Sequence, residues 1–389
     1  LQYGVIRALR NRDGWAKSWY GIMNKSILQP PSILNKIHNI KTHKFPDAKI
    51  LGLKDDYCTE RQSGGRSHAL SILDSFLSTR GKNYTKEMSS PVTAFTSCSR
   101  LSAYLAFGTI SMREVFLAAQ KREQQVKTMP PAIKNKWPSA MRSFLGRLRW
   151  HCHFIQKLET EPAIEFTAMH SAYNGIRDNN PNYEQYLKAW QTGYTGYPMI
   201  DACMRALIAT GWLNFRMRAM LISFASQHLW LHWRDTALHL ARLFTDYEPG
   251  IHYSQIQMQS GTTGINSIRI YNPIKQSIDQ DPNGVFIRHW VPELINIPHE
   301  YIHTPWAITP YNINYPKPIV DEASARKAAA AKLYNIKKQT THKQEANGIV
   351  SKHGSRKSGL TNTVKRKTKQ TTNKTINKYN NQTKQLSLL

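Results

Sequence analysis

Apolar residues return every three or four positions through most of the chain, which is the spacing of one face of an α-helix. The clearest case lies within residues 195–218, where the apolar face comprises Ile200, Cys203, Met204, Leu207 and Ile208. Gly211 follows this face directly, and a glycine after a helical run is a common helix stop. Because no segment between the helices alternates apolar and polar residues as a strand would, we predict an almost entirely α-helical body over residues 65–300.

Further helical faces are predicted on either side of this stretch. Ser111 and Glu114 occupy the two positions of a capping box, which predicts that a helix begins there. The remaining apolar faces comprise Leu70, Leu73, Phe76 and Leu77; Met217, Met220, Leu221, Phe224 and Ala225; and Trp233, Ala237, Leu240, Ala241 and Phe244.

The two ends of the chain have different patterns. Residues 1–20 are predicted to form a helix broken near Asp13-Gly14, and residues 21–64 a polar linker with several prolines. After a helical body at 65–320, the segment 321–389 is predicted to form a short helix over 322–338. The remainder is Lys-, Asn-, Thr- and Gln-rich and cannot bury enough apolar surface to fold, so we predict a disordered tail.

The charge of the chain indicates a polyanionic partner. The net charge is +28 over 389 residues; sixteen Lys or Arg against three Asp or Glu place +13 on residues 321–389 and leave +15 on the rest. The predicted folded part is therefore basic in its own right. Nucleic acid is the first candidate partner and an acidic membrane surface the second, while a solvated basic surface without a specific ligand is the alternative.

The cysteine spacing and the hydropathy of the chain argue against several classes of protein, including iron–sulfur and membrane-spanning proteins. The four cysteines form no CxxC pair, which favours a reducing intracellular compartment and gives no sign of an iron–sulfur cluster. His151 and His153 are two positions apart and would diverge on a helix, so we expect no metal site. No apolar run is long enough to span a bilayer. We expect a cytoplasmic or nucleoid protein, or a nuclear one in a eukaryote because of the basic run at residues 364–369.

Three segments carry candidate chemistry. Ser97, Ser99 and Ser102 surround Arg100 where a helix begins, an arrangement that suits a phosphate; the alternative is an ordinary N-cap with a solvent-facing arginine. A second segment places basic residues around an aromatic ring; it contains Arg142, Arg147, Arg149, Trp150 and His151. This pattern suits contact with phosphates combined with stacking on a nucleobase, although Trp150 is equally suited to a position in the core.

The third segment contains arginines with a candidate acidic partner. Trp212, Arg216 and Arg218 end a core helix, and Asp246 is the candidate ion-pair partner of Arg218; an ordinary pair between helices is the alternative. Residues 257–294 are Gly- and Asn-rich at first, and a long irregular loop inside a helical domain is usually functional.

Taken in order, six motifs of this chain resemble the FAD-binding domain of the DNA photolyase/cryptochrome family. They are SRLSAYLAFGTIS, RLRWHCHF, AWQTGYTGYPMIDACMRALIATGW, RMRAMLISF, YNPIKQS and DPNGVFIRHWVPEL. The resemblance implies an all-α bundle that holds FAD. The reduced flavin of the family donates an electron, on absorbing light, to a pyrimidine dimer flipped out of DNA. GVIRALRNRDGWAKSW resembles the last helix of the family's N-terminal antenna domain, whose sheet the sequence lacks; it resembles a truncated member without a stably bound antenna.

The resemblance also assigns residues by motif position. Those expected to bind FAD are Tyr84, Cys98, Ser99, Arg100, Leu101, Ser102, Phe144, Arg147, His151, Trp212, Arg218, Asp246, Tyr247, Glu248 and His252. Those expected to contact DNA are Arg147, Trp150, Phe215, Arg216 and Gln276. Trp150 is expected to stack on the dimer, and Trp190 and Trp233 to match the outer two tryptophans of the family's electron-transfer chain.

Four positions depart from the family pattern. Cys98 replaces a threonine, and Arg147 stands where dimer-repairing members commonly place a glutamate. His252 takes the position near flavin N5, and Ile256 stands in the inner tryptophan position.

Three functions remain open on this sequence. The first is a monomeric lyase that repairs cyclobutane pyrimidine dimers in DNA; the second is a cryptochrome-like photoreceptor that binds FAD without repair, which Arg147 and Ile256 favour. The third is a remnant that binds DNA without flavin.

Overall fold

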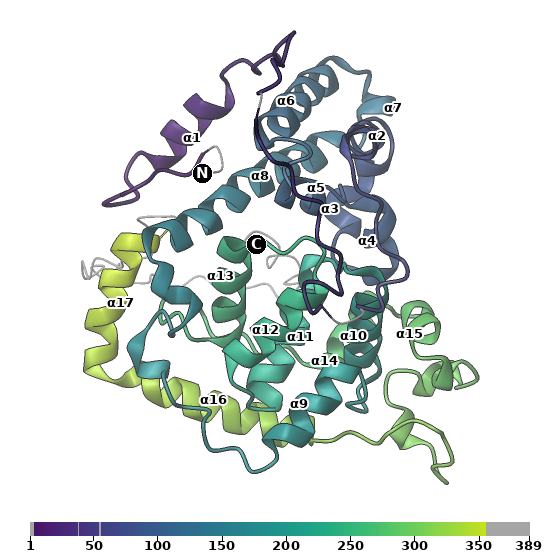
Figure 1. Cartoon of the computed structure of the whole chain (residues 1–389). Coiled ribbons are helices and arrows are strands. Elements are labelled where there is room, and N and C mark those ends of the chain that lie inside the picture. The colour runs from purple at the N-terminus through teal and green to yellow at the C-terminus, as the bar shows by residue number, and fades with distance from the viewer. Residues whose placement is uncertain (1–3, 38, 54–55, 355–389) are drawn as a thin grey trace, which may run out of the picture. The chain divides into compact units, whose positions relative to one another are not determined.

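The structure is a computed structural model that describes residues 4–37, 39–53 and 56–354, and within these ranges every regular element is a helix (Figure 1). This confirms the all-α fold. The α-helices of the first half are α1 (Trp15–Met23), α2 (Arg66–Ser78), α3 (Tyr84–Glu87), α4 (Pro91–Ser97), α5 (Ser102–Ala106), α6 (Met112–Thr128), α7 (Pro131–Lys134) and α8 (Trp137–Thr160).

The second half continues in the same way. Its α-helices are α9 (Tyr183–Thr192), α10 (Pro198–Thr210), α11 (Phe215–Ser223), α12 (Trp233–Leu243), α13 (Pro249–Ser260), α14 (Pro273–Gln280), α15 (Val285–Trp290), α16 (Glu322–Lys338) and α17 (Thr340–His353).

Two hydrophobic cores lie on either side of α8. One is formed by α1, α2, α6 and α8, with Trp19, Phe76 and Phe116 buried at its centre. The other is formed by α9 to α13 and α15, around Trp190 and Phe224. The long helix α8 packs against α6 and against α13, and so joins the two cores. A Cβ on Gly250 of α13 would lie 2.6 Å from Cα of Ile155, so the close contact of α8 with α13 requires a glycine there.

The apolar patterns predicted the central helices correctly. Ile200, Cys203, Met204 and Leu207 are buried on α10, which ends at Gly211 in the left-handed conformation, φ 67°. The capping box of Ser111 and Glu114 is present at the start of α6. The faces within 217–225 and 233–244 are buried apart from the partly exposed Ala241.

Other predictions on the helices need correction. Residues 4–14 are not helical, because α1 begins only after Gly14, whose φ is 68°. The pattern predicted that Leu70 is buried, but Leu70 is exposed, and Ala69 is buried in its place. The predicted irregular loop is short, because α14 and α15 occupy 273–280 and 285–290.

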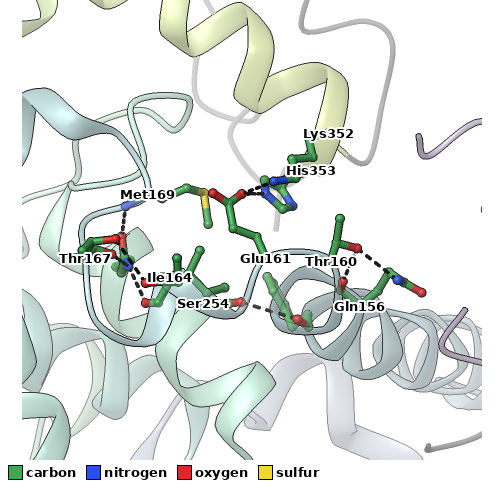
Figure 2. Close-up of polar contacts among 12 residues, drawn as sticks. Gln156, Thr160, Glu161, Ile164, Thr167, Met169, Ser254, Lys352 and His353 are labelled. Atoms are coloured by element: carbon green, nitrogen blue, oxygen red, sulfur yellow. Dashed lines mark hydrogen bonds and ion pairs between the residues drawn. The ribbon is translucent and has the colours of Figure 1, made fainter. Parts of the chain in front are cut away.

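The disordered tail was predicted to begin too early. Residues 340–353 form α17, which is held to the body by polar contacts (Figure 2). Glu161, just after α8, accepts from Lys352 Nζ at 2.9 Å and also bonds His353, while Tyr173 Oη lies 3.0 Å from His342 Nε2. Residues 355–389 of the predicted tail lie outside the described residues.

Two exclusions follow from the described part of the chain. None of its helices combines the length and the apolar character needed to cross a bilayer. It also contains no group of three or more His, Cys, Asp or Glu side chains that is arranged to hold a metal ion.

Candidate functional site

An ion pair between α11 and the turn before α13 anchors the candidate site. Arg218 donates from Nη1 and Nη2 to the two carboxylate oxygens of Asp246, at 2.9 and 2.7 Å. Burial alone would raise the pKa of Asp246, but Arg218 outweighs it and the pKa is lowered. The third nitrogen of Arg218, Nε, donates to the carbonyl of Leu213 at 2.7 Å, and its guanidinium lies 4.0 Å from the ring centroid of Phe244. The carboxylate is therefore ionised and held rigidly.

The end of α10 helps to position this carboxylate. Thr245, next to Asp246, donates its N–H to the carbonyl of Gly211 at 3.0 Å. A Cβ on Gly211 would lie 2.1 Å from Oγ1 of Thr245, so only glycine permits this approach. The helix stop seen in the sequence thus also brings the Asp246 turn against α10.

The serine-rich segment before α5 meets the same carboxylate. Ser102 lies beside Asp246, and its side chain and the nearby charge of Arg100 both lower the pKa of Asp246. Arg100 has a φ of 60°, an unfavourable value for a residue other than glycine. Gln62 holds this conformation, since its Nε2 donates to the Arg100 carbonyl at 2.9 Å and its Oε1 accepts from Arg100 Nε at 3.2 Å.

The Arg100 side chain carries an unused donor. Its guanidinium lies 3.9 Å from the ring centroid of Trp212 and 4.9 Å from that of Phe95. Burial lowers its pKa to about 10, and Nη1 is buried without a hydrogen-bond partner. A buried guanidinium N–H that lacks an acceptor is costly, so this donor indicates a place for an anionic group.

The backbone around Cys98 is fixed by a second arginine. Arg80 Nη1 donates to the carbonyls of Thr96 and Cys98, at 2.7 Å each. Burial raises the pKa of the Cys98 thiol to about 12, so this thiol is neutral and is not a nucleophile.

Tyr84, Phe144 and Arg147 lie together beside this segment. The ring centroids of Tyr84 and Phe144 are 6.2 Å apart, and the Arg147 guanidinium lies close enough to the Tyr84 hydroxyl to affect its pKa. The Arg147 guanidinium also lies 5.7 Å from the ring centroid of Phe215. Tyr84 and Phe144 are buried in the core of α2, α3 and α8, so Arg147 is the member of this group that retains a charge for a ligand.

Two histidines near Asp246, the partly buried His151 and the buried His252, are neutral. Burial lowers the pKa of His151 and of His252 to about 4 each, and the negative charge of Asp246 offsets only part of this. His252 Nε2 lies 2.9 Å from the carbonyl of Ala237, which can only accept. His252 therefore carries its proton on Nε2 and presents Nδ1 as an acceptor.

The aromatic and polar residues expected to contact DNA are partly brought together. Arg216 Nη1 donates to Oε1 of Gln276 at 3.4 Å, and Phe215 is 38% exposed beside them on α11. Trp150 packs against His153 and Phe154 on its own helix, with ring centroids 5.1 and 5.6 Å apart.

Trp190 and Trp233 lie deeper in the structure. Trp190 is fully buried and donates Nε1–H to the Leu221 carbonyl at 3.2 Å, and Trp233 stacks on His232 with centroids 5.7 Å apart. Both pack in the same hydrophobic core as the buried Ile256.

Several residues of the site had no signal in the sequence. Gln62 lies in the polar linker, and Arg80 and Phe95 follow no motif. Their roles depend on contacts across the fold that only the structure reveals. Glu248 and Tyr247, by contrast, directly follow Asp246; Glu248 caps α13 by accepting from Gly250 N at 3.2 Å.

Comparisons with known proteins show which family this chain resembles. The model of the FAD binding domain of DNA photolyase matches residues 144–335. The chain is 30% identical over 277 residues to a deoxyribodipyrimidine photo-lyase of Alkalihalophilus pseudofirmus, and this match covers 68% of the chain and 54% of that protein. It is 27% identical over 338 residues to a cryptochrome DASH of Gloeobacter violaceus, covering 82% of the chain and 64% of that protein.

A solved structure also places this chain among the photolyases and cryptochromes. The bacterial class III photolyase of Agrobacterium tumefaciens superposes with a TM-score of 0.63 at 28% identity, over 71% of this chain and 56% of that one. The chain belongs to the DNA photolyase/cryptochrome family. It spans between about half and two thirds of the length of these relatives.

FAD is the cofactor of this photolyase-type domain, and the residues present fit it. The diphosphate is an anion, and Arg100 offers a buried, unpartnered N–H beside the hydroxyl of Ser102. The ionised Asp246, which Arg218 fixes in place, has the chemistry needed to accept hydrogen bonds from flavin N–H groups.

Proposed function

We propose that this photolyase-family chain is a light-dependent flavoprotein that repairs cyclobutane pyrimidine dimers in DNA. The observation that carries the proposal is the meeting of Arg100, Ser102 and Asp246 in one buried cradle, from segments nearly 150 residues apart. The proposal also assigns the DNA-contacting surface to Arg147, Arg216 and the ring of Trp150.

The residues of this cradle, Arg100, Ser102 and Asp246, and their neighbours bind different parts of the cofactor. Arg100 and Ser102 bind the diphosphate, with Cys98, Ser99 and Leu101 providing the backbone there. Asp246 orients the isoalloxazine, and Arg218 keeps Asp246 ionised and in place. Trp212 and Phe144 form walls of the pocket, His151 and Tyr84 contact the cofactor beside them, and Tyr247 and Glu248 do so beyond Asp246. Bound FAD supplies the light-driven electron transfer.

His252 sets the hydrogen bonding at the flavin. Its Nε2–H is committed to the Ala237 carbonyl, so its Nδ1 would be available to accept a hydrogen bond from N5–H of a reduced flavin held here. A neutral histidine that can only accept there favours the reduced, protonated ring over the oxidised one.

The substrate side of the site recognises a flipped lesion. Trp150 stacks on the extruded bases, and Arg147, Phe215, Arg216 and Gln276 contact the DNA around it. The net charge of +28 favours DNA binding and makes it dependent on salt. Trp190 and Trp233 would be the outer members of an electron-transfer path through the core, whose inner position Ile256 occupies, and the protein acts as a monomer.

Illumination tests this function directly. The reduced, FAD-loaded protein is mixed with an oligonucleotide that contains a thymine dimer, and absorbance near 260 nm is followed in blue light and in the dark. Recovery of thymine absorbance in the light only is the expected result. No recovery from a protein that holds FAD and binds the oligonucleotide would refute repair.

A cryptochrome-like photoreceptor is the second candidate. Arg147 favours it, because a cation stands where repairing members commonly place a glutamate. The buried aliphatic Ile256 favours it as well, because it interrupts the aromatic path to the flavin. The same illumination experiment distinguishes the two, since the photoreceptor would change its flavin spectrum without restoring thymine.

A further inference from the structure

Basic side chains gather where the segment before α1 meets α8 and the end of α17. This basic cluster comprises Arg12, His153, Lys157 and His353. Lys157, His153 and His353 are 6%, 5% and 1% exposed, so their polar groups are largely removed from water. The cradle near Asp246 uses none of them.

The sequence builds this cluster along one face of α8. His153, Gln156, Lys157 and Thr160 are three or four positions apart and therefore lie on the same side of the helix. Gln156 fixes the chain before α1, because its Oε1 accepts from the N–H of Ile6 at 2.7 Å and its Nε2 donates to the Ile6 carbonyl at 2.9 Å.

Arg12 is held in place by the same helix face. Its guanidinium lies 4.5 Å from the ring centroid of Trp15, and its Nη2 donates to Nδ1 of His153. Trp15 is itself bonded to Gln156 through Nε1–H at 3.2 Å. The arginine is thus fixed over α8 and is not a freely solvated surface cation.

The cluster has more positive than negative charge. Its carboxylate contact is Glu161, which binds Lys352 and His353 (Figure 2). Neither Arg12 nor Lys157 has a carboxylate partner among residues 4–37, 39–53 and 56–354. With Lys352 included, three cations face one carboxylate, a net charge of +2 when both histidines are neutral.

Two polar atoms of the cluster also lack a hydrogen bond within the described part of the chain. Arg12 Nη1 and His353 Nδ1 are both buried without a partner. Neutral His353 carries its proton on Nε2, toward Glu161, so its Nδ1 is an acceptor, whereas Arg12 Nη1 is an unpaired donor. Buried like charges and this unpaired donor each cost free energy, and a bound anion would remove both costs at once.

The pKa shifts within the cluster also reflect its burial and its excess of positive charge. Burial, with the charge of Arg12, lowers the pKa of Lys157 to about 8, and burial lowers that of Arg12 to about 10. Burial depresses the pKa of His153 strongly, and Lys157, Arg12, His353 and Arg149 depress it further. For His353, burial lowers the pKa to about 4, although the bond to Glu161 acts in the opposite direction.

We propose that the basic cluster of Arg12, His153, Lys157 and His353 is a binding site for a small phosphate-bearing anion. The arginine fork and the lysine ammonium are the donors that phosphate oxygens prefer, and a phosphate dianion matches the net charge of the site. The burial of Lys157 and both histidines favours a small free anion over the backbone of DNA, which needs an open surface. Arg147 and His151 lie near Cys98 and Asp246 instead. His153 packs on Trp150, with ring centroids 5.1 Å apart, so the cluster adjoins the proposed lesion-stacking ring but shares no residue with the cradle.

Isothermal titration of the full chain with inorganic phosphate at pH 8 tests the proposal. The ionic strength is held constant with sodium chloride, and two buffers of different ionisation enthalpy are compared. We expect one saturable site with uptake of protons, because Lys157 is about half protonated at this pH and a bound dianion raises its pKa. FAD and light play no part, so failure here would leave the proposed function untouched.

Two variants and a control assign the site. Lys157→Met and Arg12→Gln should each weaken phosphate binding by about tenfold or more, and Lys157→Met should abolish the proton uptake. If Lys157→Met does not fold, Arg12→Gln gives the affinity readout alone. Lys327→Met, at an exposed position of α16, should bind phosphate as the unaltered chain does.

Three results would overturn the proposal. One is the lack of saturable phosphate binding by the unaltered chain. Another is unchanged affinity in both Lys157→Met and Arg12→Gln. The third is displacement of phosphate by an undamaged oligonucleotide, which would make the cluster part of a DNA-binding surface.

Discussion

Arg218 and Asp246 form two parallel hydrogen bonds, at 2.9 and 2.7 Å, between α11 and the turn before α13. The side chain of Asp246 is 4% exposed and also lies beside Ser102, so three segments of the chain meet at one carboxylate. This relationship connects the stability of the fold to the proposed cofactor site, and it leads to the first prediction.

Asp246→Asn should lose FAD and unfold more readily. The substitution keeps the shape of the side chain but leaves the Arg218 guanidinium without its counter-charge, which costs about 3–5 kcal/mol for a buried pair. The FAD released per protein on denaturation and the urea unfolding curve measure the two effects. The control is Asp279→Asn, whose partner Lys275 is 70% exposed and whose loss should cost about 0.5 kcal/mol. Equal FAD content in both variants would contradict the proposed role of Asp246.

Arg100→Met should weaken FAD binding by about tenfold to a hundredfold, because it removes the buried donor assigned to the diphosphate. Arg100→Lys should give an intermediate loss, since lysine keeps the charge without the planar fork. Fluorescence quenching of FAD by the apoprotein measures the affinity. Arg66→Met is the matched control, because Arg66 is exposed and bonds only Glu114 and a backbone carbonyl. An unchanged affinity in Arg100→Met would remove Arg100 from the pocket.

Stability should fall as the pH is lowered from about 6.5 to about 4. Burial lowers the pKa of His151, His239, His252 and His353 to about 4 each, so in this window the unfolded chain binds protons that the folded chain does not. The contribution is complete above pH 6.5, and each histidine removes at most about 1.4 kcal/mol per pH unit below it.

His252→Asn tests this titration. Urea unfolding at pH 7.5 reports the change in packing, and the slope of stability between pH 6 and 5 reports the protons. The slope should become shallower in the variant. An unchanged slope would mean that His252 is protonated in the folded protein, and its assignment as an N5 acceptor would fail.

Trp150→Ala should weaken binding to an oligonucleotide with a thymine dimer by about tenfold to a hundredfold, the usual worth of one stacking ring. Binding to the undamaged oligonucleotide should change much less, because no base is extruded there. Fluorescence anisotropy at fixed salt measures both. An equal loss on the two DNAs would assign Trp150 to the structure of α8, where it packs on His153 and Phe154.

Local patterns predicted much of the fold but not all of it. The buried face of α10, its end at Gly211 and the capping box of α6 depend on residues close in sequence, and all three were predicted correctly. The helix α17 was missed because its residues are mostly polar. It is held by distant contacts, such as Glu345 with the backbone of Ser171 at 2.7 Å and His342 with Tyr173.

In the candidate site, too, some residues were predictable from the sequence and others were not. The family motifs indicated Arg100, Arg218 and Asp246, which the structure brings together. Gln62 escaped notice because nothing in a polar linker marks the one glutamine that holds a strained backbone 38 residues away. Sequence patterns find the side chains that a ligand needs, whereas the residues that position them are defined by the packed structure.

The flavin content of the purified chain tests the central claim most directly. The protein is incubated with FAD, freed of unbound cofactor and denatured, and the released flavin is identified and quantified by chromatography. The account predicts close to one FAD per chain, falling sharply in Arg100→Met and in Asp246→Asn. A folded, colourless chain that takes up no FAD would contradict it.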